Sequence, residues 1–262
     1  MSVGAGPAVA VALALACAAC GAGSPQVLAR GVLPYGLVAE AGRVVSVELA
    51  ERFELVVRPE RQLTAPRRLE LGPPELDLRA LAVNQTTAYV GTDTGWIWEI
   101  DLATMARRRS LVVGAPVVAL AANEQLLASA DASGALCLRR LSDGALLQCA
   151  LAPFAVGALR LDREHLWILP PADAAAPPHR WTVPALIPAP TVSEKLPAEV
   201  PWRDGVVWFI GEVLWWRRGA ERRPLFAMPS SIRAVVVTGA KQLVVAAWSR
   251  QLTDPAIVVW SR

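Results

Sequence analysis

Short apolar runs separated by polar turns recur along the chain, and residues 88–101 ("AYVGTDTGWIWEID") show the pattern clearly. Two runs of apolar residues flank the turn "TDTG", and the second run continues into an acidic position. Because successive side chains of a strand point to opposite faces, this pattern predicts two strands joined by a tight turn. No helix-length apolar stripe follows, so a βαβ arrangement is not expected.

The unit recurs at a fixed interval of 39 residues. Four of its positions map onto identical residues one interval later: Leu81, Asn84, Gly95 and Leu102 onto Leu120, Asn123, Gly134 and Leu141. A second interval maps Leu120, Asn123 and Leu127 onto Leu159, Asp162 and Leu166. A period near 40 residues with several strands per repeat is typical of β-propeller blades.

Weaker copies on both sides extend the array, so we predict an all-β fold: a single β-propeller domain over residues 27–262. Six blades fit the pattern, and five or seven remain compatible with it. They are expected at 33–63, 76–115, 116–153, 154–192, 195–228 and 230–262. Residues 64–75 are expected to be a connector. A strand within 27–33 is expected to complete the last blade, because this removes an exposed sheet edge.

The copy at 88–101 resembles the repeat of pyrroloquinoline-quinone enzyme-like propellers, which often contain "YVGT", a glycine three residues later and a closing aspartate. The matching residues are Tyr89, Val90, Gly91, Thr92, Gly95, Ile97 and Asp101. Propellers built from WD repeats have the same order of strands and turns. The resemblance implies a fold and no particular reaction.

The paired tryptophans in this copy raise the question of a cofactor. Trp96, Trp98 and Ile100 share one strand face, where we expect them to form core between blades. The alternative is a stacking platform for a quinone or a sugar. We therefore expect no cofactor.

Residues for catalysis or metal binding are sparse. Neither histidine, His165 or His179, has a metal-ligating residue at a suitable spacing. Asp93 and Asp131 lie in glycine-containing turns, where aspartate commonly accepts hydrogen bonds from its own backbone. A non-enzymatic protein is expected. The alternatives are a small secreted hydrolase or lyase with paired carboxylates, or a lectin with exposed aromatic side chains.

Charge adds little to this picture. The net charge is +3, and the arginine doublets are scattered along the chain. Such a distribution predicts solvated arginines, so no nucleic-acid partner is expected.

The N-terminus predicts export. Residues 1–29 carry no charge, and 9–16 ("VAVALALA") form an apolar run of signal-peptide length. The following "CAACGAGS" resembles a bacterial lipobox, which implies a signal peptide at 1–19, lipid attachment at Cys20 and a tether at 20–26. A simply cleaved export signal and an uncleaved anchor are the alternatives.

Cys137 and Cys149 flank a predicted hairpin, "CLRRLSDGALLQC". A three-residue loop with Gly144 in the left-handed conformation places Leu141 opposite Ala145 and the two cysteines opposite each other. A two-residue Asp-Gly turn would slip the register by one and separate the sulfurs. We predict the disulfide, because exported proteins meet oxidising conditions.

Residues 170–190 contain seven prolines, which a blade interior does not tolerate. An insertion in the fourth blade is therefore expected. Its residues Arg180, Trp181, Leu186 and Ile187 could form a semi-rigid arm that contacts a partner, and the alternative is a solvated loop. The leading hypothesis is a lipid-anchored propeller of the cell envelope that binds envelope proteins.

Overall fold

The computed structural model describes most of the chain beyond its N-terminal segment. The described residues are 26–30, 32–78, 80–171, 178–189, 200–202, 205–210, 213–227, 232–238, 242–247 and 256–260. The chain divides into two compact units, one comprising 1–44, 58–66 and 197–262, the other comprising 45–57 and 67–196.

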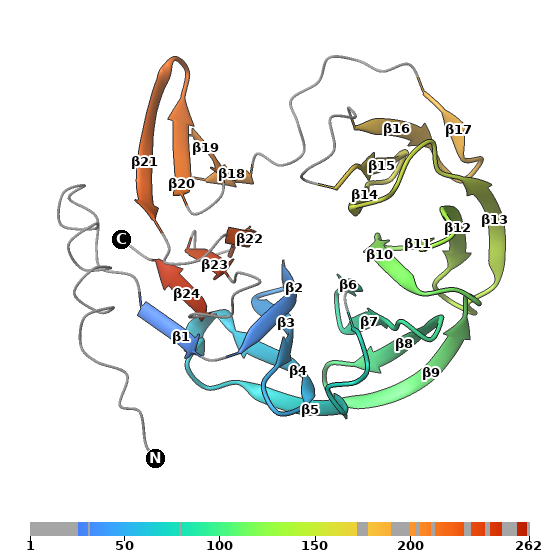
Figure 1. Cartoon of the computed structure of the whole chain (residues 1–262), viewed down its shortest axis with the longest axis horizontal. Coiled ribbons are helices and arrows are strands. Elements are labelled where there is room, and N and C mark those ends of the chain that lie inside the picture. Colours follow the sequence, from blue (N-terminus) through green and yellow to red (C-terminus); the bar gives the residue numbers. More distant parts are fainter. Residues whose placement is uncertain are drawn as a thin grey trace. The chain divides into compact units, whose positions relative to one another are not determined.

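The described residues form six four-stranded antiparallel sheets, which show the predicted β-propeller fold (Figure 1). Three consecutive sheets belong wholly to the second unit, and in each the strands pair in chain order. Their strands are β6(Ala80–Asn84), β7(Thr87–Gly91), β8(Trp96–Asp101) and β9(Ala106–Val112); β10(Val117–Ala122), β11(Leu126–Asp131), β12(Ala135–Arg140) and β13(Leu146–Leu151); β14(Ala158–Leu161), β15(His165–Leu169), β16(His179–Thr182) and β17(Ile187–Pro188).

Two of the remaining sheets lie in the first unit. One has the strands β18(Val200–Trp202), β19(Gly205–Ile210), β20(Val213–Arg218) and β21(Glu221–Ala227), and the other has β22(Ile232–Val237), β23(Leu243–Ala247), β24(Ala256–Trp260) and β1(Gln26–Arg30). The antiparallel pairing of β1 with β24 confirms that an N-terminal strand completes the last sheet.

The sixth sheet holds β2(Leu33–Glu40), β3(Arg43–Leu49), β4(Phe53–Pro59) and β5(Arg67–Gly72), with the short 3-10 helix Glu60–Gln62 before β5. Strand β5 corrects the prediction of a connector over 64–75. Its sequence "RRLELG" has three charged residues and only two apolar ones, so the alternation is too short to predict a strand.

The 39-residue spacing is confirmed in the second unit, because β7, β11 and β15 begin at residues 87, 126 and 165. Equivalent turns also share their backbone conformation, since Gly95 and Gly134 have φ of +81° and +86°. A Cβ atom on Gly95 would lie 2.9 Å from the backbone nitrogen of Ala115, so a larger residue does not fit there.

Apolar clusters lie between successive sheets of the second unit. One joins β6–β9 to β10–β13 and includes Ile97 and Leu127. The next joins β10–β13 to β14–β17 and includes Leu136, Ile168 and Trp181. In the first unit, Trp202, Trp216 and Val245 belong to a comparable cluster. Both faces of a middle strand are therefore buried, as is usual where a sheet packs between two others.

This double burial corrects our expectation for the tryptophan pair. Ile97, on the face opposite Trp96 and Trp98, is fully buried, whereas Trp96 is 39% exposed. The Trp98 ring is half-buried beneath the Arg107 guanidinium, 5.1 Å from the ring centroid. The two tryptophans are therefore only partly buried, although their strand β8 lies inside the sheet between β7 and β9.

Among the described residues, no helix is long and apolar enough to span a membrane.

Candidate functional site

Side chains from the edge of one sheet bind backbone carbonyls of the next sheet throughout the second unit. Arg67 at the start of β5 donates to the carbonyls of Leu102 and Ala103, at 3.3 and 2.9 Å. Arg109 of β9 donates to the carbonyl of Leu141 at 2.6 Å. Gln148 of β13, one repeat beyond Arg109, donates to the carbonyl of Ala185 at 2.7 Å. Each acceptor lies in the turn that follows the third strand of the next sheet.

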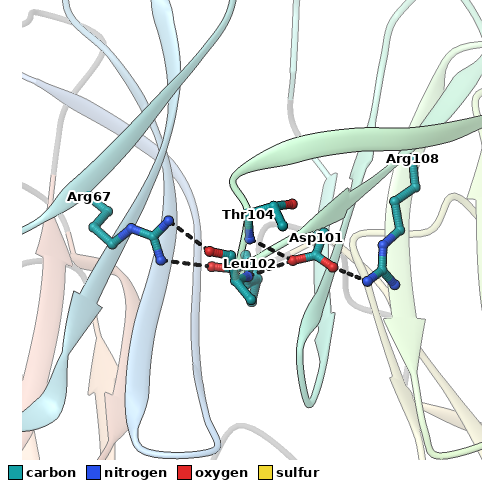
Figure 2. A network of polar contacts seen from close by, with 6 residues as sticks. Arg67, Asp101, Leu102, Thr104 and Arg108 are labelled. Carbon is teal, nitrogen blue, oxygen red and sulfur yellow. Dashed lines mark hydrogen bonds and ion pairs between the residues drawn. The ribbon is translucent and has the colours of Figure 1, made fainter.

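Asp101 organises the first of these turns (Figure 2). Its carboxylate is buried at the end of β8 and accepts the backbone N–H groups of Ala103 and Thr104 at 2.7 and 2.8 Å. The other oxygen pairs with Arg108, which extends from β9 on the far side from Arg67. The aspartate therefore fixes the turn whose carbonyls Arg67 contacts, and this role is structural.

A polar pocket of about 500 Å³ lies between the sheets β6–β9 and β10–β13. Its lining comprises Asn84, Thr87, Tyr89, Glu99, Arg108, Arg109, Glu124, Leu141 and Ser142. The charged side chains in it are paired: Glu99 with Arg109 at 2.5 Å, Arg108 with Asp101, and Glu124 with Arg163. Burial, together with the negative charge of Glu99, raises the pKa of Tyr89 to about 12.

This pocket offers no activated group. A phenol with so high a pKa stays protonated at neutral pH, and carboxylates held by arginines are poor general bases. The described residues contain no group of three or more histidine, cysteine or acidic side chains placed to hold a metal.

Asp131 and the histidines have local partners, whereas the buried Oδ1 of Asp93 has no hydrogen-bond partner among the described residues. The Asp131 carboxylate accepts the N–H groups of Ser133 and Ala135 at 2.9 and 3.0 Å, which confirms its predicted role in a turn. The backbone N–H of His165 donates to Asp162 at 2.7 Å, and the ring of His179 packs edge-on against Phe154.

Large apolar side chains are exposed along the fourth strands of the second unit. On β13, Leu146, Leu147 and Leu151 are 53%, 39% and 74% exposed. Val112 of β9 and Ile187 of β17 are each more than half exposed. We call these five residues the edge patch. Sequence analysis missed its β13 members, although "LLQCAL" has neither a charge nor a proline, which is unusual for an exposed edge.

The structure places Cys137 directly opposite Cys149 and joins them by a disulfide. The predicted register is correct at the cysteines, and Gly144 has the predicted left-handed conformation, with φ of +76°. The loop differs, because the N–H of Arg140 donates to the carbonyl of Ala145, leaving four residues in the turn. A bulge beyond Leu138 then restores the register.

Oxidation of this pair in the exported protein stays a prediction. The mature chain should resist alkylation at both residues until it is reduced, which intact-mass measurement detects. The bond closes a short loop, so Cys137→Ser with Cys149→Ser should lower the free energy of unfolding by no more than about 3 kcal/mol. Two alkylated thiols in the unreduced exported protein would contradict the prediction.

The proposed arm at 170–190 is wrong for the residues that the structure describes there. Arg180 and Trp181 lie in β16, the third strand of its sheet, and Trp181 and Leu186 are buried in the core. Arg180 stacks over Trp167 at 5.5 Å. Of the four named residues only Ile187 is largely exposed. Residues 172–177 lie outside the described part.

The described prolines of this segment are tolerated because they avoid the central strands. Pro184 belongs to the turn after β16, and Pro188 lies in the two-residue edge strand β17. Neither position requires an N–H group within a ladder. The segment contributes β16 and β17 to its sheet, so we expect its removal to destabilise the protein.

Cys20, the predicted signal peptide at 1–19 and nearly all of the tether lie outside the described residues. Strand β1 begins at Gln26, the last residue assigned to the tether.

Comparison of the sequence with protein-family models and with curated proteins finds no match. Solved structures are similar in fold. They include the WD40 β-propeller domain of Doa1, with a TM-score of 0.63, 12% identity and coverage of 89% of this chain and 96% of that one. A chain of the mitotic checkpoint complex has a TM-score of 0.61, 13% identity and coverages of 88% and 92%.

The WD40 repeats of RRP9 match with a TM-score of 0.55, 12% identity and coverages of 90% and 84%. At such low identity these likenesses concern the fold alone. The narrower resemblance to quinone-enzyme repeats stays a prediction. The sheets, their 39-residue spacing and these neighbours together show that the chain is a β-propeller similar in fold to WD40 proteins.

Proposed function

We propose that the chain is a non-enzymatic scaffold that binds a protein partner through the edge patch, and that it is anchored to the cell envelope by lipid on Cys20. The exposed leucines of β13 carry the first part of the proposal. Three large apolar side chains exposed on one short strand exceed the scattered single ones usual on a protein surface, and such groups are typical of protein-binding sites. One similar structure belongs to a chain of a multiprotein complex, which is consistent with a scaffold.

The polar pocket supports the same conclusion. Its charged groups neutralise one another. Its arginines also hold the turns that join the third and fourth strands of these sheets. Such groups contribute to rigidity, and a rigid surface loses little conformational entropy on binding. The anchor is supported by the uncharged apolar segment and by the lipobox-like "CAACGAGS".

Site-specific photo-crosslinking in intact cells tests the scaffold. A photoreactive amino acid placed singly at Leu151, Val112 and Ile187 should give a specific crosslinked partner band from at least one of these positions. The exposed Arg163, outside the patch, serves as the matched control and should give none. Absence of a specific band at all three patch positions would contradict the proposal.

Fractionation tests the anchor. The wild-type chain should sediment with membranes and become detergent-soluble, and Cys20→Ala should release it or leave the precursor uncleaved. Cys17→Ala is the matched control and should leave the membrane association unchanged. A soluble, unmodified mature chain beginning at another residue would refute the anchor.

A further inference from the structure

We infer that β13 is a docking edge for an extended segment of a partner protein, which adds to the β10–β13 sheet as a fifth strand. This inference rests on the proposed scaffold function and names the mode of binding. The strand lies last in its sheet, and no other strand in the described part of the chain pairs with its free edge.

The cysteine pair shows which backbone groups face outward. The Cα atoms of Cys137 and Cys149 are 4.1 Å apart. Opposite residues of an antiparallel pair approach to about 4.5 Å where they exchange no backbone hydrogen bonds, and lie about 5.5 Å apart where they do. The N–H and C=O groups of Cys149 therefore point away from β12, and those of Leu151, two residues later, do the same.

A bulge limits the length of this edge. The register shifts between Leu138 and Arg139, so Leu147 is the extra residue on β13 and interrupts the ladder there. Regular pairing with a partner strand is thus available from Gln148 to Leu151 and can continue to residue 152. The partner segment needs only about four or five extended residues.

The composition of β13 differs from that of the fourth strand of every other sheet. Charged residues or proline occur in β1, β5, β9, β17 and β21, but "LLQCAL" has neither. Charges and prolines protect edges against strand addition. The absence of both at an exposed strand, with Leu151 mostly in solvent, leaves this edge open to a partner strand.

The disulfide prepares the edge for binding. It ties Cys149, in the centre of the open stretch, to the middle of β12, and so holds the outward N–H and C=O groups in a fixed register. A fixed edge loses less conformational entropy when a partner strand adds to it. Leu147 and Leu151 flank the disulfide and offer apolar contacts to alternate side chains of the segment.

Charge and area favour a partner segment over a second copy of this chain. Arg139 and Arg140 end β12 beside the start of β13. Asp143 pairs with Arg140, whereas Arg139 donates to the backbone carbonyls of Gly144 and Val112, so this end keeps a net positive charge that attracts an acidic residue. A six-residue strand is about 20 Å long. Stable dimers bury about 1,200–2,000 Å², far more than two such edges would cover, whereas strand addition of short peptides needs no larger surface.

Selection from a random heptapeptide phage library on the oxidised mature chain tests the inference. We expect peptides with alternating β-branched or aromatic residues and an acid near one end. Leu151→Lys should weaken their affinity at least tenfold. The matched control Ser110→Lys, at an exposed position of β9 outside the edge patch, should change it less than twofold. Melting temperatures of both variants should equal that of the wild type, which separates binding from folding.

N-methylation of the selected peptide distinguishes strand addition from mere apolar contact. Methyl groups on alternate amides should abolish binding, whereas those on the intervening amides should have little effect. Failure to select any peptide, equal sensitivity of all amides, or unchanged affinity of Leu151→Lys would overturn the inference. A concentration-dependent dimer that Leu151→Lys dissociates would overturn it in favour of a second copy.

Crosslinking separates this inference from the scaffold proposal. A partner band from Val112 or Ile187 without one from Leu151 would overturn docking at β13 and leave the scaffold intact.

Discussion

Trp181→Ala should lower the free energy of unfolding by about 3–5 kcal/mol, the range typical for truncating a buried tryptophan. Trp181 is 5% exposed and packs with Leu166 and Leu186 between two sheets. Removing the indole leaves a cavity that these neighbours cannot fill without moving. Urea unfolding followed by circular dichroism measures the change.

Two companion variants sharpen this test. Trp181→Phe should cost only about 1–2 kcal/mol, because most of the apolar volume remains and the buried indole N–H has no hydrogen-bond acceptor among the described residues. Ile187→Ala, in the neighbouring edge strand, should change stability by less than about 0.5 kcal/mol because its side chain is exposed. The opposite ranking of Trp181→Ala and Ile187→Ala would restore the interpretation of this segment as a separate arm.

Asp101→Ala should lower the free energy of unfolding by about 3–4 kcal/mol. The substitution removes two hydrogen bonds, from the N–H groups of Ala103 and Thr104, to a buried carboxylate, and a hydrogen bond to a charged group contributes about 1.5–3 kcal/mol. It also removes the ion pair with Arg108 and loosens the turn that Arg67 contacts. Urea unfolding at neutral pH measures the effect.

Two controls separate the hydrogen bonds from the charge. Asp101→Asn keeps an oxygen acceptor for both N–H groups and loses only the pairing with the exposed Arg108, so about 1 kcal/mol is expected. Asp143→Ala removes an exposed carboxylate that also accepts a turn N–H, and it should cost less than about 1 kcal/mol. An Asp101→Ala effect no larger than that of Asp143→Ala would show that the turn does not depend on the aspartate.

The sequence by itself determined the fold class, the repeat spacing and the pairing of the two cysteines. The first two rest on local signals, because alternating apolar residues mark the middle strands and glycines mark left-handed turns. The cysteines meet as predicted, but through a four-residue turn and a bulge at Leu147 that the sequence did not reveal. The 39-residue interval follows because each sheet needs the same set of buried positions. The third and fourth strands of the β14–β17 sheet were missed, because the prolines around them suggested an insertion.

Only the tertiary structure decided which strands end each sheet and which side chains are exposed. An edge strand packs on fewer neighbours, so it carries no regular apolar pattern, and β5 therefore resembled a connector in the sequence. Alternation cannot reveal that Ile97 is buried and Trp96 exposed, because this depends on how much of each side chain the neighbouring sheet covers. The sequence is equally silent about β13, whose leucines would also suit a buried strand. They are exposed because β13 lies last in its sheet.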